Sequence, residues 1–288
     1  MGNLTDTLTF PAPAKLNLFL HVVGRRADGY HLLQTLFRFV DFSDRLHFSL
    51  REDGVVRRNS ELNGVPQEHD LCVRAARMLQ QETGCGLGVD LTLEKSIPMG
   101  GGLGGGSSDA ATTLIALNRL WGLGLSRERL MEIALLLGAD VPVFVFGENA
   151  YAEGVGEQLQ AWVVPDAWYV ILFPPAHVAT SRVFEQLQFA KSRLTPDAIS
   201  RRIRGLSLRH PQNDLQSVVC GLYPEVARHV AWLERFGLAR MSGSGACVFA
   251  EFAAETEARA VVDRLPPDMK GIVARGLPHH PLRDWVAM

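Results

Sequence analysis

The sequence predicts an α/β (α+β) protein of two domains, and three observations support this. Its 288 residues exceed the roughly 100–200 residues that one domain usually holds. Strand-like and helix-like segments are interspersed along the chain instead of forming two separate blocks. The pair Pro165-Asp166 separates two strand-like segments and is typical of a linker. We therefore place the two domains at residues 1–164 and 165–288.

The first predicted strand covers residues 15–23. Leucine and valine alternate there with other side chains at the period of a half-buried strand, which places Lys15 and Asn17 on the same face. The same alternation predicts strands at residues 46–50 and 89–93.

Three helices are predicted in the first domain. One covers residues 71–84, where Gly84 can end it. The second begins at the N-capping Ser107 or Ser108 and ends before Gly122. The third covers residues 126–138 and leaves Asp140 in the turn that follows.

The second domain continues the same mixture of elements. Thr195 and Pro196 are typical of an N-cap followed by proline at the first helical position. Apolar spacing predicts further helices at residues 223–236 and 254–265. Strands are predicted around Trp168, Val248 and Ile272, and a further one around Tyr151 near the end of the first domain.

The composition excludes several classes of protein. The 29 lysines and arginines are balanced by 31 aspartates and glutamates, so we expect no basic field that would attract nucleic acid or a membrane surface. The longest apolar runs are far shorter than the roughly 20 residues that cross a bilayer. The four cysteines have no zinc-site spacing. We expect a cytoplasmic protein with reduced thiols and small-molecule partners.

The densest functional signal is the segment KSIPMGGGLGGGSSDAATTL, which begins at Lys95. Six glycines surround Leu103 and lead directly into a predicted helix. Glycine lets the backbone approach a phosphate closely, and a helix N-terminus offers unpaired amides and a positive dipole end. The segment therefore predicts an anion site, to which the hydroxyls of Ser107 and Ser108 could contribute.

This loop is open to three other interpretations. Gly100, Gly102 and Gly105 match the dinucleotide pattern GxGxxG, but Leu125 stands where the acidic ribose ligand is expected. A Walker A loop needs a lysine after the last glycine, and serine follows instead. A flexible linker rarely contains an embedded leucine followed at once by a strong helix.

Two further segments have less specific patterns. In GADVPVF, Asp140 taken alone is more often a turn or capping aspartate than a catalytic base. In SGSGACVFAEF, residues 242–246 form a second glycine-serine turn, which either packs against the phosphate loop, touches the substrate, or is a plain structural turn.

Four segments in this order resemble the motif set of the GHMP kinases: PAPAKLNLFL, PMGGGLGGGSSDAA, GADVPVF and MSGSGACVF. The resemblance covers nearly the whole chain. Two more segments, GRRADGYHLLQT from Gly24 and AEGVGEQL from Ala152, resemble those GHMP kinases that act on a cytidine-containing substrate in the non-mevalonate isoprenoid pathway.

The resemblance implies a two-domain fold, with an N-terminal ATP-binding domain, a C-terminal α+β sandwich domain and the active site in the cleft between them. It implies an ATP-dependent kinase that phosphorylates the 2-hydroxyl of a cytidine diphosphate-linked methylerythritol. Asp140 would accept the proton of that hydroxyl, and Lys15 would stabilise the carboxylate and the developing charge. Asn17, Tyr30, His31, Thr180 and Phe184 would bind the substrate.

The resemblance also implies a set of ATP contacts. These are Leu71, Lys95, Pro98, Gly100, Gly101, Gly102, Leu103, Gly104, Gly105, Gly106, Ser107 and Ser108. Mg²⁺ would arrive with ATP and lie near Ser107 or Ser108, with no metal fixed by the protein alone. The chain departs from the family pattern at His69-Asp70, where related enzymes often have an asparagine.

Two rival functions follow from the same motifs. A homoserine or mevalonate type of GHMP kinase would use the same loop on another alcohol, but the DGYH segment and Phe184 argue against it. A catalytically silent nucleotide sensor would be expected to lose Asp140 or Lys15, and both are present.

Overall fold

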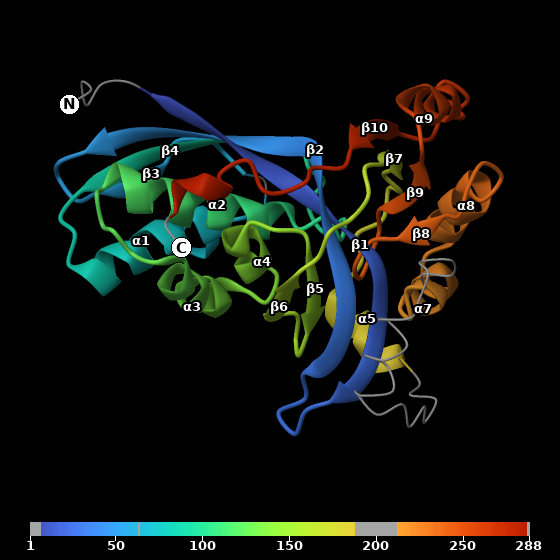
Figure 1. The fold of residues 1–288 in the computed structure, drawn as a ribbon, viewed down its shortest axis with the longest axis horizontal. Helices are drawn as coiled ribbons and strands as arrows, with labels where there is room; N and C mark the ends of the chain where they lie inside the picture. Colours follow the sequence, from blue (N-terminus) through green and yellow to red (C-terminus); the bar gives the residue numbers. More distant parts are fainter. Residues whose placement is uncertain (1–6, 63, 188–211, 287–288) are drawn as a thin grey trace.

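The computed structural model describes residues 7–62, 64–187 and 212–286, which form two sheets with helices packed on them (Figure 1). The first sheet has six strands in the order β3-β4-β2-β5-β6, with β1 paired to β2. Its strands are β1 (Leu8–Arg25), β2 (His31–Arg51), β3 (Val56–Arg58), β4 (Gly88–Glu94), β5 (Ala150–Glu153) and β6 (Gln158–Ala161). All of these pairings are antiparallel except the parallel pair β3 and β4.

The second sheet has four antiparallel strands in the order β10-β7-β9-β8. Its strands are β7 (Trp168–Leu172), β8 (Arg240–Met241), β9 (Val248–Phe252) and β10 (Gly271–Arg275). The mixed α/β architecture with two units agrees with the prediction. The boundary at residue 165 stays a prediction.

The helices divide between the two sheets. Those beside the first sheet, on the left of Figure 1, are η1 (Gln67–His69), α1 (Leu71–Thr83), α2 (Gly105–Leu120), α3 (Arg127–Leu137) and α4 (Val141–Phe146). Those that follow β7 in the chain are α5 (Thr180–Gln186), α7 (Gln216–Leu222), α8 (Pro224–Leu233) and α9 (Glu255–Val262). Within the described ranges no helix is long and apolar enough to cross a membrane.

Three apolar clusters hold these layers together. One lies between the first sheet and helices α1 to α4, and a second lies between the second sheet and helices α7 to α9. The third joins the two sheets, with Leu16 and Leu18 of β1 packed against Phe249 of β9. The long β1–β2 pair therefore contacts both halves of the molecule, as Figure 1 shows.

The C-terminal segment after β10 returns to the first sheet. The backbone N–H of Leu277 donates to the carbonyl of Phe39, and Leu282 and Val286 are buried in the first cluster. Arg127 donates to the carbonyls of Arg283 and Val286. These residues, which belong to the predicted domain 165–288, thus contact the first sheet and its helices.

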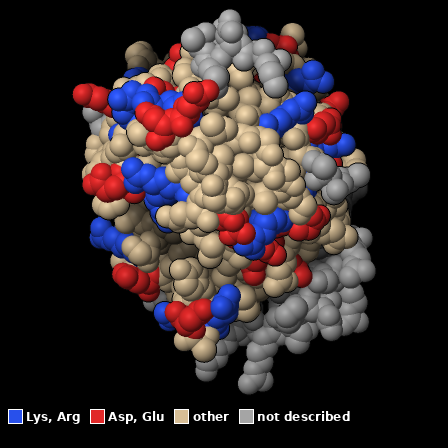
Figure 2. Space-filling model, turned by 90° about the vertical axis from the view of Figure 1, so that its left-hand side faces the viewer, with Lys and Arg blue, Asp and Glu red and all other residues tan. Residues whose placement is uncertain are grey.

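The surface carries interspersed charges of both signs on the face that Figure 2 shows. Arg129 of α3, for example, lies beside Glu82 of α1 and Glu132 of its own helix. This mixture agrees with the nearly balanced count of acidic and basic residues in the chain.

Most predicted elements of the sequence are present, with one correction. Helix α2 begins at Gly105 and not at Ser107 or Ser108, because Gly104 adopts a left-handed N-cap conformation (φ +72°) and supplies the helix start without a side-chain cap. The apolar run from Val141, for which no element was predicted, forms the helix α4, with proline in its first turn. The helix predicted from Thr195 lies outside the described residues.

Candidate active site

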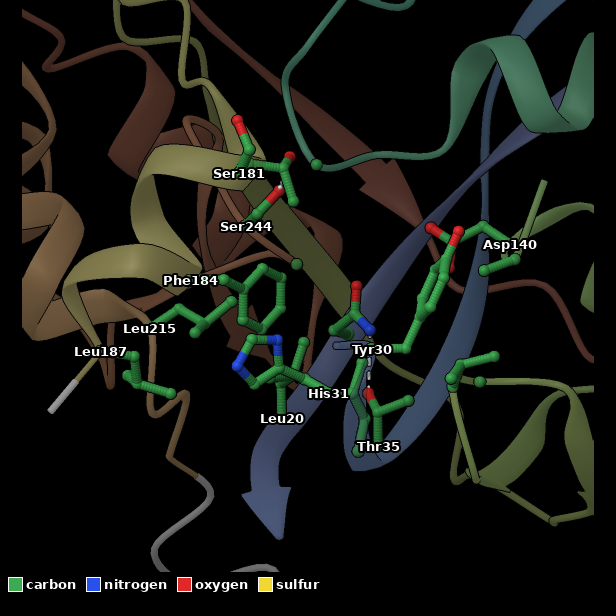
Figure 3. Close-up of a pocket in the computed structure, with 18 of the residues that line it drawn as sticks. Leu20, Tyr30, His31, Thr35, Asp140, Ser181, Phe184, Leu187, Leu215 and Ser244 are labelled. Carbon is green, nitrogen blue, oxygen red and sulfur yellow. Dashed lines mark hydrogen bonds between the residues drawn. The ribbon is translucent and has the colours of Figure 1, made fainter. Parts of the chain in front are cut away.

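A cavity of about 840 Å³ lies between the β1–β2 hairpin, the α3–α4 turn, helix α5 and the turn before β9. It brings together side chains from segments that are far apart in the sequence (Figure 3). Its lining includes all the predicted catalytic and substrate residues: Lys15, Asn17, Tyr30, His31, Asp140, Thr180 and Phe184.

Lys15 and Asp140 form an ion pair, with 3.2 Å between Nζ and Oδ2. The lysine side chain is only 2% exposed, whereas the aspartate is 39% exposed and faces the cavity. Strand β1 fixes the lysine, whose backbone N–H donates to the carbonyl of Leu103 in the glycine run. Asp140 occupies the N-cap position of α4. The pair can therefore accept a proton from a hydroxyl and stabilise the negative charge that develops.

Asn17 lies next to Lys15 on the same strand face, as the alternation predicted. Lys15 Nζ donates to Asn17 Oδ1 at 2.5 Å. The lysine ammonium also lies over the ring of Phe37, 5.3 Å from its centroid. The side chains of Lys15 and Asn17 are both buried. The ammonium of Lys15 thus has three neighbours: the carboxylate of Asp140, the amide oxygen of Asn17 and the aromatic face of Phe37.

The opposite part of the cavity is aromatic and apolar. The His31 ring stacks on Phe184, with centroids 4.5 Å apart and planes at 17° (Figure 3). Burial and the nearby charge of Arg25 lower the pKa of His31, which favours the neutral ring. A planar base has no room between these two rings as they stand. Tyr30, 62% exposed, lies at the margin.

Several lining residues were not found from the sequence. Leu20, Leu187 and Leu215, from three separate segments, lie beside Phe184 in Figure 3, and Leu33 also lines the cavity; these four leucines are called the leucine wall. Ser244 Oγ is hydrogen-bonded to Thr180 Oγ1 at 2.8 Å, and Thr35 reaches the cavity from β2. The alternation of β2 could have indicated Thr35, whereas no local pattern indicates the leucine wall.

The glycine run passes along one side of the cavity and then enters helix α2. Gly102 lines the cavity, and a Cβ on it would lie 2.1 Å from the carbonyl oxygen of Ser242, so no other residue fits there. Ser242 Oγ donates to the carbonyl of Gly102 at 2.9 Å, and Cys247 N–H donates to that of Gly101. The 242–246 turn thus packs against the loop, one of the three roles considered for it.

Lys95, predicted to contact ATP, already has two partners within the protein. Its ammonium pairs with Asp109 of α2, 2.8 Å away, and with the buried Asp44 of β2. Burial, opposed by Lys95 and reinforced by Asp44, raises the pKa of Asp109 to about 8. Burial favours the neutral amine of Lys95, but the two carboxylates outweigh it and raise its pKa. Both aspartates were missed by the sequence analysis.

Helix α1 brings one further predicted residue, Leu71, close to the run. Leu71 is its first residue, and a Cβ on Gly106 would lie 3.7 Å from Leu71 Cδ1. Asp70, at the departure from the family pattern, is the N-cap of α1 and accepts from the N–H groups of Cys72 and Val73. Its carboxylate also pairs with Arg58.

The start of α2 fits an anion with its counterion. Ser108 Oγ is fully buried, and no protein group within the described ranges hydrogen-bonds to it. Gly106 is exposed beside it, and a helix start carries backbone amides without partners inside the helix, to which an anion can bind. Among the same residues no cluster of three or more His, Cys, Asp or Glu side chains could hold a metal ion.

Comparison with known proteins identifies the family. The model of the GHMP kinases N terminal domain matches residues 70–148, and that of the GHMP kinases C terminal domain matches residues 199–270. The chain is 60% identical to the 4-diphosphocytidyl-2-C-methyl-D-erythritol kinase of Nitrosospira multiformis, over 96% of this chain and 94% of that one. The chain belongs to this family of GHMP kinases.

Other relatives agree with this membership. The corresponding kinase of Thiobacillus denitrificans is 59% identical over 96% of this chain and 98% of its own. A crystal structure of 4-(cytidine 5'-diphospho)-2C-methyl-D-erythritol kinase is 34% identical, with a TM-score of 0.79 over 93% of this chain and 99% of its own. A homoserine kinase from Cytophaga hutchinsonii, at 18% identity and a TM-score of 0.72 over 97% of both chains, shares the fold.

Proposed function

We infer that this chain is an ATP-dependent kinase that phosphorylates the 2-hydroxyl of 4-diphosphocytidyl-2-C-methyl-D-erythritol. The products are the 2-phosphate and ADP, in the non-mevalonate route to isoprenoid precursors. The observation that carries this function is the 60% identity, over nearly the full length of both chains, to a kinase of that name. The cavity supports it, because one space contains both an acid–base pair and an aromatic surface.

We propose that Asp140 accepts the proton of the attacking hydroxyl while Lys15 stabilises the charge that develops. The ammonium is buried and already paired with the carboxylate, so little reorganisation is needed when the substrate binds. Asn17 would hold the lysine and contact the substrate alcohol. Phosphoryl transfer depends mainly on positioning and charge neutralisation, and these residues provide both at the acceptor side.

For the donor side we propose the run from Gly100 to Ser108 as the phosphate cradle. Its glycines and the first amides of α2 would bind the phosphate oxygens, and Mg²⁺ carried by ATP would neutralise their charge near Ser107 or Ser108. Leu71, Lys95 and Pro98 flank this run. Because Asp44 and Asp109 already occupy the ammonium group of Lys95, the lysine would contact the nucleotide through its stem or backbone.

For the cytidine end we propose His31, Tyr30, Thr180 and Phe184. A base that stacks on Phe184 from the side of His31 requires the histidine ring to move aside, since the two rings are in contact. The neutral ring of His31 can then both donate and accept hydrogen bonds at the base edge. We propose a cytoplasmic location and no nucleic-acid partner, in line with the balanced charge.

The rival kinases are less well supported. The homoserine kinase of Cytophaga hutchinsonii and the mevalonate kinase of Methanococcus jannaschii are 18% and 14% identical to this chain. Likeness at this level shows the common fold alone. A silent sensor is opposed by the intact Lys15–Asp140 pair.

Measurement of ADP release tests the function. Purified protein is assayed with ATP and, in turn, 4-diphosphocytidyl-2-C-methyl-D-erythritol (the cytidine-containing substrate), mevalonate and homoserine. We expect turnover with the cytidine-containing substrate; saturation only by mevalonate or homoserine would overturn this assignment. Asp140→Asn should fold normally and lower kcat about 10²- to 10⁴-fold, the usual contribution of a positioned proton acceptor.

The matched control is Asp284→Asn, which changes an aspartate that is 81% exposed and does not line the cavity. It should leave kcat unchanged. If Asp140→Asn stayed within a few-fold of the wild type, Asp140 would not be the proton acceptor.

A further inference from the structure

Strand β1 contains a bulge directly beside the ion pair. Its register with β2 passes from Asn17 opposite Phe37 to Leu20 opposite Thr35, so two residues of β1 stand against one of β2. Bulges bend a strand and re-aim neighbouring side chains, and they often occur next to active sites. This one places the side chain of Thr35 against the backbone of the bulge.

Side chains bind both carbonyl groups of the bulge. Arg240 Nη1 donates to the carbonyl of Leu18 at 2.9 Å. Thr35 Oγ1 donates to the carbonyl of Phe19 at 2.5 Å. A carbonyl oxygen can only accept, so the single hydroxyl proton of Thr35 is committed to Phe19.

This commitment sets the direction of the next hydrogen bond. With its proton in use, Thr35 Oγ1 can only accept, and Asn17 Nδ2 donates to it at 2.8 Å. The amide nitrogen of Asn17 therefore faces Thr35, and the amide oxygen faces Lys15 Nζ at 2.5 Å. The chain of donors runs one way, from the ammonium through the amide and the hydroxyl to the backbone.

We propose that Thr35 is a positioning residue, which keeps the amide oxygen of Asn17 turned toward Lys15 and thereby holds the ammonium against Asp140. The proposal rests on the roles proposed above for Lys15 and Asp140. Thr35 itself acts through Asn17, although it also reaches the wall of the cavity.

Burial makes this direction important. Lys15, Asn17 and Thr35 are each no more than 2% exposed, so water cannot easily replace a lost partner. Without the Thr35 oxygen, the Asn17 amide is free to turn over. Its NH₂ group would then face the lysine ammonium, donor against donor, and Lys15 would be displaced from its position beside Asp140.

Steady-state kinetics of Thr35 variants test the proposal. Thr35→Val keeps the shape of the side chain but removes both hydrogen bonds, and we expect kcat to fall about 10- to 100-fold, the range for a misplaced catalytic group. The KM values for ATP and for the cytidine-containing substrate should change less than about threefold, since this residue acts on the reacting groups. Thr35→Ser restores the hydroxyl and should recover kcat.

The matched control is Thr112→Val, which removes the hydroxyl of a fully buried threonine whose partner is the carbonyl of Pro11. It should lower the melting temperature less than Thr35→Val, because it removes one bond of 3.4 Å and not two shorter ones, and it should leave kcat unchanged. If Thr35→Val does not fold, Thr35→Cys keeps a weaker donor in the same place and should show a smaller loss of kcat in the same direction.

A double-mutant cycle separates action through Asn17 from direct contact with substrate. When Thr35→Val is added to Asn17→Ala, the kcat of the double variant should be less than about twofold below that of Asn17→Ala. The full loss in that background would overturn the proposal and indicate a direct contact. Turnover of the wild type, measured first, tests the proposed function by itself. If the wild type is active and Thr35→Val has the same kcat, the positioning role alone is overturned.

Discussion

A substitution at Gly106 can test the proposed phosphate cradle, because its effect on ATP binding should be opposite to its effect on stability. It is the second residue of helix α2, is exposed, and would place a Cβ in ordinary contact, 3.7 Å from Leu71 Cδ1. Alanine is favoured over glycine in a helix by about 0.5–1 kcal/mol, and the first turn gives the lower end of that range. Gly106→Ala should therefore raise the melting temperature by about 1–2 °C.

The same methyl group should impair ATP binding. If the phosphates approach the amide of Gly106, the added Cβ occupies their path, and an overpacked contact costs about 1–3 kcal/mol. At about 1.4 kcal/mol per factor of ten, the KM for ATP rises about 5- to 150-fold. The assays are thermal unfolding without ligand and ADP release at varied ATP concentration.

Gly221→Ala is the control for this prediction. Gly221 is an exposed glycine in helix α7 that does not line the cavity, and a Cβ on it would meet no atom within 4 Å. Its variant should gain similar stability at an unchanged KM for ATP. A Gly106→Ala protein that is stabilised and retains the wild-type KM would refute the cradle at this position.

Two further predictions concern Phe184 in the cavity and the buried carboxyl group of Asp109. Phe184→Leu should raise the KM for the cytidine-containing substrate about 5- to 150-fold and leave the KM for ATP within about twofold, because stacking of a base on an aromatic ring contributes about 1–3 kcal/mol. The native Asp109 carboxyl, with a pKa raised to about 8 by burial, keeps a proton that its unfolded form, near 3.8, has released. The stability of the native protein should therefore fall as the pH rises between these two pKa values. Between about pH 6 and pH 8.5, the melting temperature of Asp109→Asn should fall less than that of the wild type.

Controls for both are available in the chain. Phe236→Leu changes a phenylalanine that contacts Trp232 and does not line the cavity, so both KM values should stay unchanged. An unaltered KM for the cytidine-containing substrate in Phe184→Leu would exclude stacking on this ring. Asp284→Asn, at an exposed site, should retain the pH dependence of the wild type. Equal changes in Asp109→Asn and wild type would mean that Asp109 is ionised throughout the window.

Local patterns in the sequence predicted the features that depend on residues close together in the chain. The alternation of β1 placed Lys15 and Asn17 on one face, and the structure joins them by a hydrogen bond. The period of apolar residues and the terminal glycines located α1 and α3. Such patterns determine elements because strand and helix repeats are two and about 3.6 residues long.

Long-range packing decided the rest. The pairing of Lys15 with Asp140 spans the first domain, and the sequence could suggest it only through a resemblance to known enzymes. The sharing of the Lys95 charge by Asp44 and Asp109 has no local signal, since it depends on β2 and α2 lying side by side. The start of α2 was misplaced because serine caps are the commoner solution.

The sequence by itself thus determined that this chain has a glycine loop at a helix start and a lysine and an asparagine on one strand face. The tertiary structure alone decided how these groups are oriented. A bulge in β1 brings Thr35 to the carbonyl of Phe19 and so fixes the direction of the hydrogen bonds that reach Lys15. A bulge depends on the register between two strands, and register is a property of their pairing.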